Sequence, residues 1–129
     1  MEFLKRALHG LPPVIYGDGE QTRDFIHVRD AVSAIVKAVE SEGARGVYNI
    51  GSGEAISINR LAETVLKVLS INSLKPIHQQ PRKGDIKHSH ADIARASRDL
   101  GFKPTVKLEE GIRELAAVLR QEARRQPNT

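Results

Sequence analysis

Two short segments each place an arginine beside glycine-containing backbone, an arrangement suited to holding a phosphate. The first is Arg23–His27, which follows the turn Gly17–Gly19, and the second is Arg82–Asp85. A guanidinium presents its donors as a planar fork that matches phosphate oxygens two at a time. Each arginine taken singly also fits a solvated surface group or a salt-bridge partner. The spacing alone leaves both interpretations open.

Two Gly-x-Gly pairs are candidates for a dinucleotide-binding loop. That fingerprint requires a third glycine three residues later, where helix and strand approach closely. The chain has Ile56 at that place after Gly51-x-Gly53, and Thr22 after Gly17-x-Gly19. We therefore interpret both pairs as turns.

A third candidate is a zinc site at His88-x-His90-x-Asp92, with His78 upstream. In an extended chain those three side chains share one face, and imidazole and carboxylate are zinc ligands. Asp92 is equally placed to cap the helix that follows, and exposed histidines are common. We favour the cap and expect no metal.

Composition is that of an ordinary globular protein. The 129 residues are 40% hydrophobic and 28% charged, and no apolar run approaches the roughly 20 residues that a membrane span needs. There is no cysteine, which excludes disulfides and thiolate sites. The net charge of +4 comes with only 4% aromatic residues, too few to stack single-stranded bases, so a nucleic-acid partner is not expected. We expect a cytoplasmic protein, with one domain over residues 1–125 and a polar tail over residues 126–129.

Helical and extended stretches alternate along the chain. Helices are predicted over Glu2–His9, from Asp30 to Gly43, from Ser57 to Leu69, from Asp92 to Leu100 and over Leu108–Arg124. Short strands are predicted over Val14–Tyr16, Phe25–Val28, Val47–Ile50 and Leu74–Gln79, the last interrupted by Pro76 at a sheet edge. Asp30, Ser57 and Asp92 are the expected N-caps, and Gly101 the left-handed residue after a helix. The pattern predicts an α/β fold with too few strands for a self-sufficient doubly wound sheet.

The segment Tyr16–Ala31, Y-G-D-G-E-Q-T-R-D-F-I-H-V-R-D-A, resembles one found in NAD-dependent epimerases and dehydratases of the extended short-chain dehydrogenase type, after their catalytic half. Four further matching segments follow in the family's order: Val47–Gly51, Arg82–Asp85 with Asp92, Leu100–Pro104 and Leu108–Ile112. The similarity runs from about Phe3 to Leu119. Within the family it is greatest to UDP-glucose 4-epimerase-like proteins.

This resemblance implies roles for particular residues. Arg23 and Arg82 match arginines that hold the diphosphate and ribose region of the nucleotide. Asp85 matches a carboxylate near the ribose hydroxyls. Val14 and Tyr16 lie on the strand that borders the uracil.

The resemblance also implies roles for three neighbouring residues. Phe25 stands where an aromatic side chain lines the pocket wall, a place at which many relatives have Tyr. Asp24 and His27 match residues that brace the turn and the helix after it. The resemblance thus implies a substrate-binding set of six side chains, Asp24 and His27 excluded.

The family's catalytic features are missing from these 129 residues. Complete members carry a Gly-rich nicotinamide loop and a Tyr-x-x-x-Lys pair that transfers the proton. Here Tyr16 is followed four positions later by Glu20, and Tyr48 by Ser52. NAD is implied for the full-length enzyme, but none is expected to bind this chain, which should be unable to catalyse the reaction alone.

The sequence therefore predicts the UDP-sugar-binding portion of a nucleotide-sugar epimerase. The alternatives are a free-standing nucleotide-sugar-binding or interaction module, and the same portion of a dehydratase or decarboxylase. The expected partners are a UDP-sugar and a separate or missing Rossmann domain, packed on Val47–Ile50 and on the helix after Asp30. Without that domain, the exposed apolar surface should promote homo-oligomers.

Overall fold

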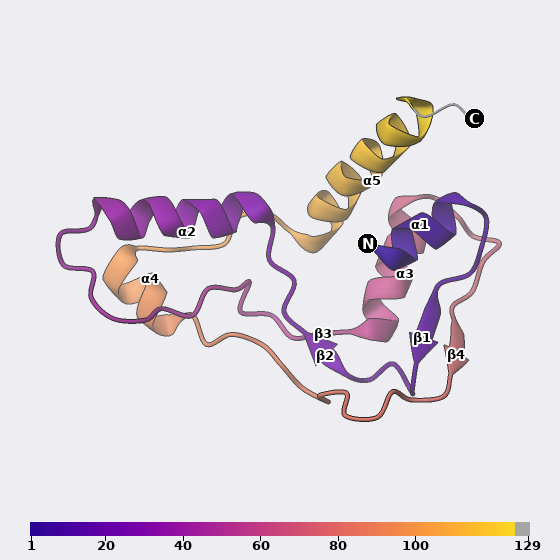
Figure 1. The fold of residues 1–129 in the computed structure, drawn as a ribbon, viewed down its shortest axis with the longest axis horizontal. Helices are drawn as coiled ribbons and strands as arrows, with labels where there is room; N and C mark the ends of the chain where they lie inside the picture. Colours follow the sequence, from indigo (N-terminus) through magenta and orange to yellow (C-terminus); the bar gives the residue numbers. More distant parts are fainter. Residues whose placement is uncertain (126–129) are drawn as a thin grey trace. The chain divides into compact units, whose positions relative to one another are not determined.

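A computed structural model describes residues 1–125, which form five helices and four short strands (Figure 1). In chain order the elements are α1 (Glu2–Leu8), β1 (Val14–Tyr16), β2 (Thr22–Arg23), α2 (Val28–Glu40), β3 (Ile56–Ser57), α3 (Ile58–Val68), β4 (Ile77–Gln79), α4 (Ala94–Leu100) and α5 (Leu108–Arg125). The α/β class with few short strands is confirmed. The tail over residues 126–129 lies outside the described residues.

The chain forms two compact units. The first contains Met1–Gln21, Ser57–Asp85 and residues 109–125, and the second contains Thr22–Ile56 and Ile86–Leu108. Each unit is described below by itself. Among residues 1–125, no helix has both the length and the apolar character that crossing a membrane requires.

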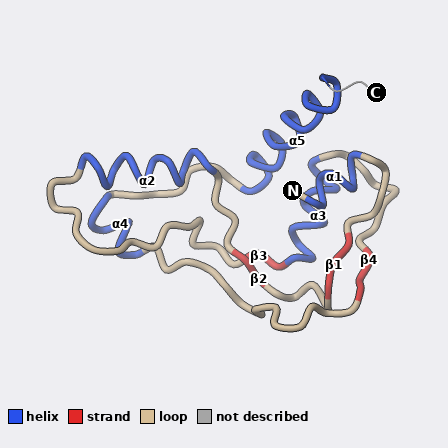
Figure 2. The backbone as a smooth tube through the Cα atoms, in the orientation of Figure 1, coloured by secondary structure: helices blue, strands red, loops and turns tan. Residues whose placement is uncertain are grey.

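In the first unit, β1 and β4 run side by side as a parallel pair (Figure 2). The register matches Ile15 with His78, and the Ile15 side chain is buried. β4 begins at Ile77, whose N–H donates to the Pro13 carbonyl at 2.9 Å. Pro76 has no N–H to donate, so it precedes the strand instead of interrupting it, which corrects the predicted Leu74–Gln79 strand.

Helix α3 begins where the sequence predicts. The Ser57 hydroxyl accepts from the Arg60 N–H at 3.2 Å, which confirms this N-cap. The N–H groups of Ile58 and Asn59 donate to the carbonyls of Gln21 and Gly19 at 3.1 and 3.0 Å. The turn after β1 thus meets the N-terminus of α3, while α1 packs along the same helix.

In the second unit, α2 packs on α4 around a small core. Ala34 of α2 meets Ala96 and Leu100 of α4 and the fully buried Phe102. Gly101 ends α4 with a φ of 62°, the left-handed conformation that glycine adopts without a steric penalty. This prediction is confirmed.

The start of α2 differs from the prediction. The helix begins at Val28, and His27 is its N-cap, accepting from the Arg29 N–H through Nδ1 at 3.2 Å. Asp30 lies inside the first turn with its carboxylate buried and bonded elsewhere in the second unit. The predicted Phe25–Val28 strand is therefore wrong.

Two other predicted elements also differ. Asp92 lies one residue before the N-cap of α4, although its carboxylate still accepts from the Ala94 N–H at 2.9 Å. The segment Val47–Ile50 is not a strand, because it has no strand beside it among the described residues. Arg95 holds its start by donating to the carbonyls of Val47 and Arg45 at 3.1 and 2.8 Å.

One side of α2 is apolar and exposed. Its small residues, Ala34 and Ala38, face the core, whereas Ile35 is 64% exposed and Val39 82% exposed. We call the exposed set the α2 stripe: Val28, Val32, Ile35, Val36 and Val39. Such a stripe on a helix normally packs against another surface.

Candidate functional site

Three of the six predicted site residues meet in the first unit, at the end of β1. The Arg82 guanidinium carbon lies 3.9 Å from the centroid of the Tyr16 ring. This is the geometry of a cation–π contact, which orients the guanidinium over one face of the ring. Asp85 lies on the same loop as Arg82, and its backbone N–H donates to the Arg82 carbonyl at 3.2 Å.

That loop closes through a glycine. Gly84 has a φ of 82°, and a Cβ there would meet nothing within 4 Å, so backbone conformation is what requires glycine. The resulting turn keeps the exposed side chains of Arg82 and Asp85 close together. Both are thus accessible to a ligand.

Gln21 links the two sides of this cluster. Its amide Nε2 donates to the Tyr16 carbonyl at 2.7 Å and, at the longer distance of 3.4 Å, to Oδ2 of Asp85. The sequence alone does not predict a role for Gln21. Its position within the Tyr16–Ala31 segment that resembles the family was the one sequence feature that could have indicated a role. Its proximity to Asp85 depends on the fold.

The turn between Tyr16 and Gln21 is itself constrained. The Gly17 N–H donates to the Gln79 carbonyl at 2.9 Å, and Oδ1 of Asp18 accepts from the Glu20 N–H at 2.9 Å. Gly19 is buried with a φ of 77°. Val14 is half-buried two residues before Tyr16, so the two side chains lie on the same face of β1.

Arg23 and Phe25 belong to the second unit. The Arg23 guanidinium donates to the Thr22 carbonyl at 2.7 Å, and Thr22 is paired with His88 in a parallel bridge. Arg23 lines an open depression of about 480 Å³ together with Tyr48, Asn49, Ser89, His90 and Asp92. Phe25 is half-buried and is not among the residues that line it.

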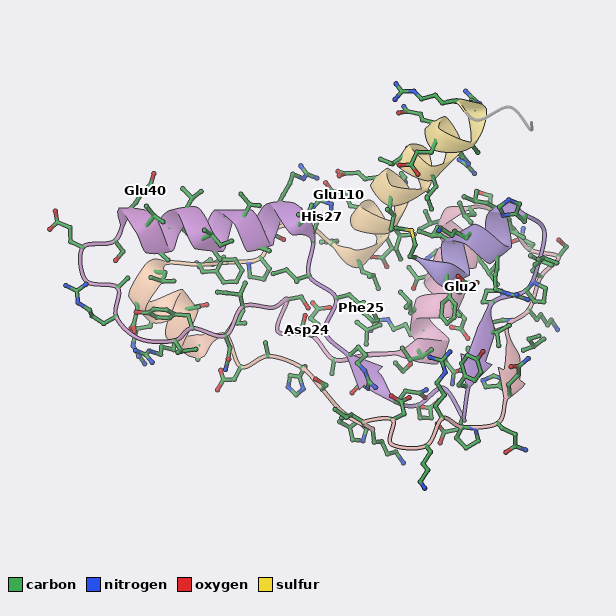
Figure 3. All side chains as sticks on the ribbon, in the orientation of Figure 1. Glu2, Asp24, Phe25, His27, Glu40 and Glu110 are labelled. Carbon is green, nitrogen blue, oxygen red and sulfur yellow. The ribbon has the colours of Figure 1, made fainter. Side chains whose placement is uncertain are left out.

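Asp24, labelled in Figure 3, is half-buried and bonds to two other segments of the second unit. Its carboxylate accepts from the N–H and hydroxyl of Ser52 at 2.7 and 2.6 Å, from the Gly53 N–H at 3.0 Å and from the Ala91 N–H at 3.2 Å. Burial by itself would raise the pKa of Asp24, but these hydrogen bonds outweigh burial and hold the pKa below its usual value. The charged Asp24 carboxylate therefore has a structural role, because it holds together the segments that contain Ser52 and Ala91.

The histidines do not gather. His88 bonds to Thr22 through Nδ1 at 3.1 Å in the second unit, and His78 bonds to Asn59 through Nε2 at 2.9 Å in the first. Within the described part of the chain, no group of three His, Cys, Asp or Glu side chains is placed to hold a metal ion.

The sequence matches both a protein family and individual known proteins. Residues 1–115 match the family described as GDP-mannose 4,6 dehydratase. The chain is 38% identical over 122 residues to the dTDP-4-dehydro-6-deoxyglucose reductase of Escherichia coli, covering 92% of this chain and 37% of that protein.

Solved structures show the same likeness. The UDP-glucose 4-epimerase of Thermotoga maritima with UDP-glucose superposes with a TM-score of 0.86 at 36% identity, over 94% of this chain and 38% of that one. The UDP-glucuronic acid 4-epimerase of Bacillus cereus, in complex with UDP-glucuronic acid and NAD, gives a TM-score of 0.85 at 32% identity, over 95% and 40%. The chain thus spans 37% to 40% of the length of these three proteins.

Proposed function

Because the chain belongs to the NAD-dependent epimerase/dehydratase family of extended short-chain dehydrogenases, as its C-terminal portion, we propose that it is the UDP-sugar-binding portion of a UDP-glucose 4-epimerase-like enzyme. The observation that carries this proposal is the cluster of Arg82, Tyr16 and Asp85, joined through Gln21. It combines a cation, an aromatic ring and a carboxylate, which match a diphosphate, a base and a ribose respectively.

Each residue has a proposed role. Arg82 donates to the diphosphate, and its stack on Tyr16 limits the conformations it must give up on binding. Asp85 accepts from the ribose hydroxyls. Val14 and Tyr16 border the uracil.

Roles for Arg23 and Phe25 are proposed from the family resemblance. Arg23 would add a second guanidinium for the diphosphate, and Phe25 an apolar wall. Their support is the family match of the segment that contains them.

The residues present do not fit NAD. At Gly19 the space that a pyrophosphate would need is filled by the Asn59 side chain, and at Gly51 by the carboxylate of Asp24 and, 2.7 Å from an ideal Cβ, by Ala91. A carboxylate at such a loop repels phosphate. In the whole enzyme NAD would supply transient oxidation at C4 of the sugar, and we propose that this chain neither binds NAD nor turns over sugar alone.

We propose that the α2 stripe and the segment Val47–Ile50 are covered by the cofactor-binding half of such an enzyme. Val47 is 80% exposed, and Val39 on α2 is 82% exposed. In the absence of that half, the same surface would associate with another copy of the chain. The alternatives are a binding module without catalysis and the corresponding portion of a dehydratase, decarboxylase or reductase.

The test is calorimetric titration of the 129-residue chain with UDP and with dTDP. Arg82→Ala and Arg23→Ala should each weaken UDP binding about ten- to a hundredfold, since a charge-assisted hydrogen bond contributes about 1.5–3 kcal/mol and about 1.4 kcal/mol is one decade. Lys83→Ala removes a neighbouring charge and is the matched control. Arg82→Lys should restore binding only in part, because an ammonium lacks the planar fork.

Two results would contradict the proposal. Unchanged UDP affinity in both arginine variants would show that Arg23 and Arg82 do not bind the nucleotide. Tighter binding of dTDP than of UDP would favour the relatives that act on dTDP-sugars over the epimerase.

A further inference from the structure

Asn59, in the first turn of α3, contacts three residues in two separate parts of the first unit. Its amide nitrogen Nδ2 donates to the Asp18 carbonyl at 2.9 Å and to Oε1 of Glu20 at 2.7 Å. Its oxygen Oδ1 lies 2.9 Å from Nε2 of His78 on β4. One side chain therefore joins the turn after β1 to the neighbouring strand.

The orientation of this amide is determined by its partners. The Asp18 carbonyl and the Glu20 carboxylate can only accept, so the nitrogen must face them both. The oxygen then faces His78, whose Nε2 must carry the hydrogen. Every hydrogen-bonding direction of the amide except one lone pair is used.

The turn is built to receive this side chain. The Asn59 backbone N–H donates to the Gly19 carbonyl at 3.0 Å, and a Cβ on Gly19 would collide with the Asn59 amide. Gly19 is thus glycine both because of its φ of 77° and because Asn59 lies against it.

The two ends of that turn carry the candidate ligand-binding groups. Tyr16 precedes the turn and stacks under Arg82 at 3.9 Å, and Gln21 follows it and donates toward Asp85. We propose that Asn59 is a positioning residue for the nucleotide site: it touches no ligand, but holds the turn so that Tyr16 and Gln21 keep Arg82 and Asp85 in place. The proposal rests on the proposed function for the identity of that site.

Asn59→Asp is the informative variant, because it keeps the size and the acceptor for His78. It removes both donations and sets a carboxylate against that of Glu20, so the turn should move. Asn72→Asp is the matched control, since Asn72 lies exposed in the loop after α3 and changes the charge equally. In E20Q/N59D the new amide can donate to the new carboxylate, which restores one of the two lost links.

The first measurement needs no ligand. The chain has two tyrosines, so a Tyr48→Phe background leaves Tyr16 as the single source of tyrosine ring signals in NMR. Asn59→Asp should shift the Tyr16 ring resonances toward their positions in Arg82→Ala, whereas Asn72→Asp should not. E20Q/N59D should return them most of the way to wild type.

The second measurement is UDP affinity by calorimetry. Asn59→Asp should weaken binding about five- to tenfold, the equivalent of one ordinary hydrogen bond, and E20Q/N59D should recover at least half of that loss on a logarithmic scale. Asn72→Asp should bind as wild type.

The outcomes separate the two ideas. Unmoved Tyr16 resonances in Asn59→Asp, or a lower melting temperature with neither a shift nor an affinity change, would overturn the positioning role. A shift with wild-type UDP affinity, in a protein that loses binding in Arg82→Ala, would also overturn it. If the Tyr16 resonances shift as expected but the chain does not bind UDP, the proposed function is wrong. The structural role of Asn59 in holding the turn would then still be established.

Discussion

The buried carboxylate of Asp30 receives two hydrogen bonds from Thr105, one from the backbone N–H at 3.0 Å and one from the hydroxyl at 2.8 Å. The Val106 N–H adds a third at 3.0 Å. Asp30 is 3% exposed, and its partners lie 75 and 76 residues further along the chain. This one side chain ties the start of α2 to the segment that follows Phe102.

We expect Asp30→Asn to destabilise the chain by about 1.5–3 kcal/mol, the contribution of a hydrogen bond to a charged group. The introduced amide would turn an N–H₂ toward N–H donors. Glu40→Gln, at the exposed end of the same helix, removes the same charge and should change stability little. Urea denaturation compares the two, and equal stability would show that the Asp30 bonds contribute nothing net.

Acid should weaken the second unit. Burial would raise the pKa of Asp30, but hydrogen bonds from Val106 and Thr105 outweigh it and hold the pKa below the ordinary value of 3.8, as for Asp24. A carboxyl with a lowered folded-state pKa contributes stability that is present above its unfolded pKa and lost as the pH falls through the folded pKa. The melting temperature should therefore fall progressively below about pH 4. The fall should be shallower in Asp30→Asn; an unchanged slope would contradict the assignment.

The stack of Arg82 on Tyr16 should be visible in binding. Tyr16→Phe keeps the ring and should leave UDP affinity within about twofold, whereas Tyr16→Leu should weaken it about two- to fivefold, since an exposed cation–π contact contributes about 0.5–1 kcal/mol. Calorimetry with UDP measures both. Equal affinity in the Phe and Leu variants would show that the ring face is not what positions Arg82.

Two glycines offer a matched pair for stability. A Cβ at Gly51 would collide with the Asp24 carboxylate and lie 2.7 Å from the Ala91 Cβ, whereas at Gly43 it would meet nothing within 4 Å. Gly51→Ala should therefore cost about 1–3 kcal/mol, as overpacking does. Gly43→Ala should be neutral or stabilising by up to about 1 kcal/mol. Thermal melts of the two variants check this, and similar melting temperatures would contradict it.

Self-association should depend on the α2 stripe. The double variant I35E/V39E places two charges on it and should lower the average mass seen by light scattering at high concentration. Val118→Glu, at a 49% exposed position of α5, is the control and should not. A wild-type chain that stays monomeric at high concentration would contradict the expectation.

Local sequence signals were sufficient where the interacting groups are neighbours in the chain. Ser57 caps α3 through Arg60, three residues on, and Gly101 ends α4 as predicted. The five helices and the strand Val14–Tyr16 followed from apolar periodicity and residue propensity in the same way, whereas the two-residue strands β2 and β3 were not predicted. In the candidate site, Arg82 and Asp85 share one loop, so their proximity followed from spacing.

Local sequence signals failed to predict the structure where a residue interacts with a partner far away in the chain. Asp30 has the residue type of a cap, but its donors at Thr105 and Val106 cannot be identified from local sequence. Val47–Ile50 has strand propensity without a strand to pair with in residues 1–125. Gln21 and Asn59 were missed because an amide has no recognisable pattern until the fold brings its partners to it.

The division into two units has a consequence for biosynthesis. Every residue of the second unit lies between Thr22 and Leu108, whereas the first unit needs α5, which starts the last stretch of the chain. A ribosome releases the N-terminal end first, at about 5–20 residues per second. The second unit is therefore fully synthesised while the first still lacks the helix that carries the buried Ile112 and Ala116. A chain that ends before Glu109 would therefore keep every residue of the second unit but lack Ile112 and Ala116, so the apolar side chains that pack against those two in the first unit would be exposed.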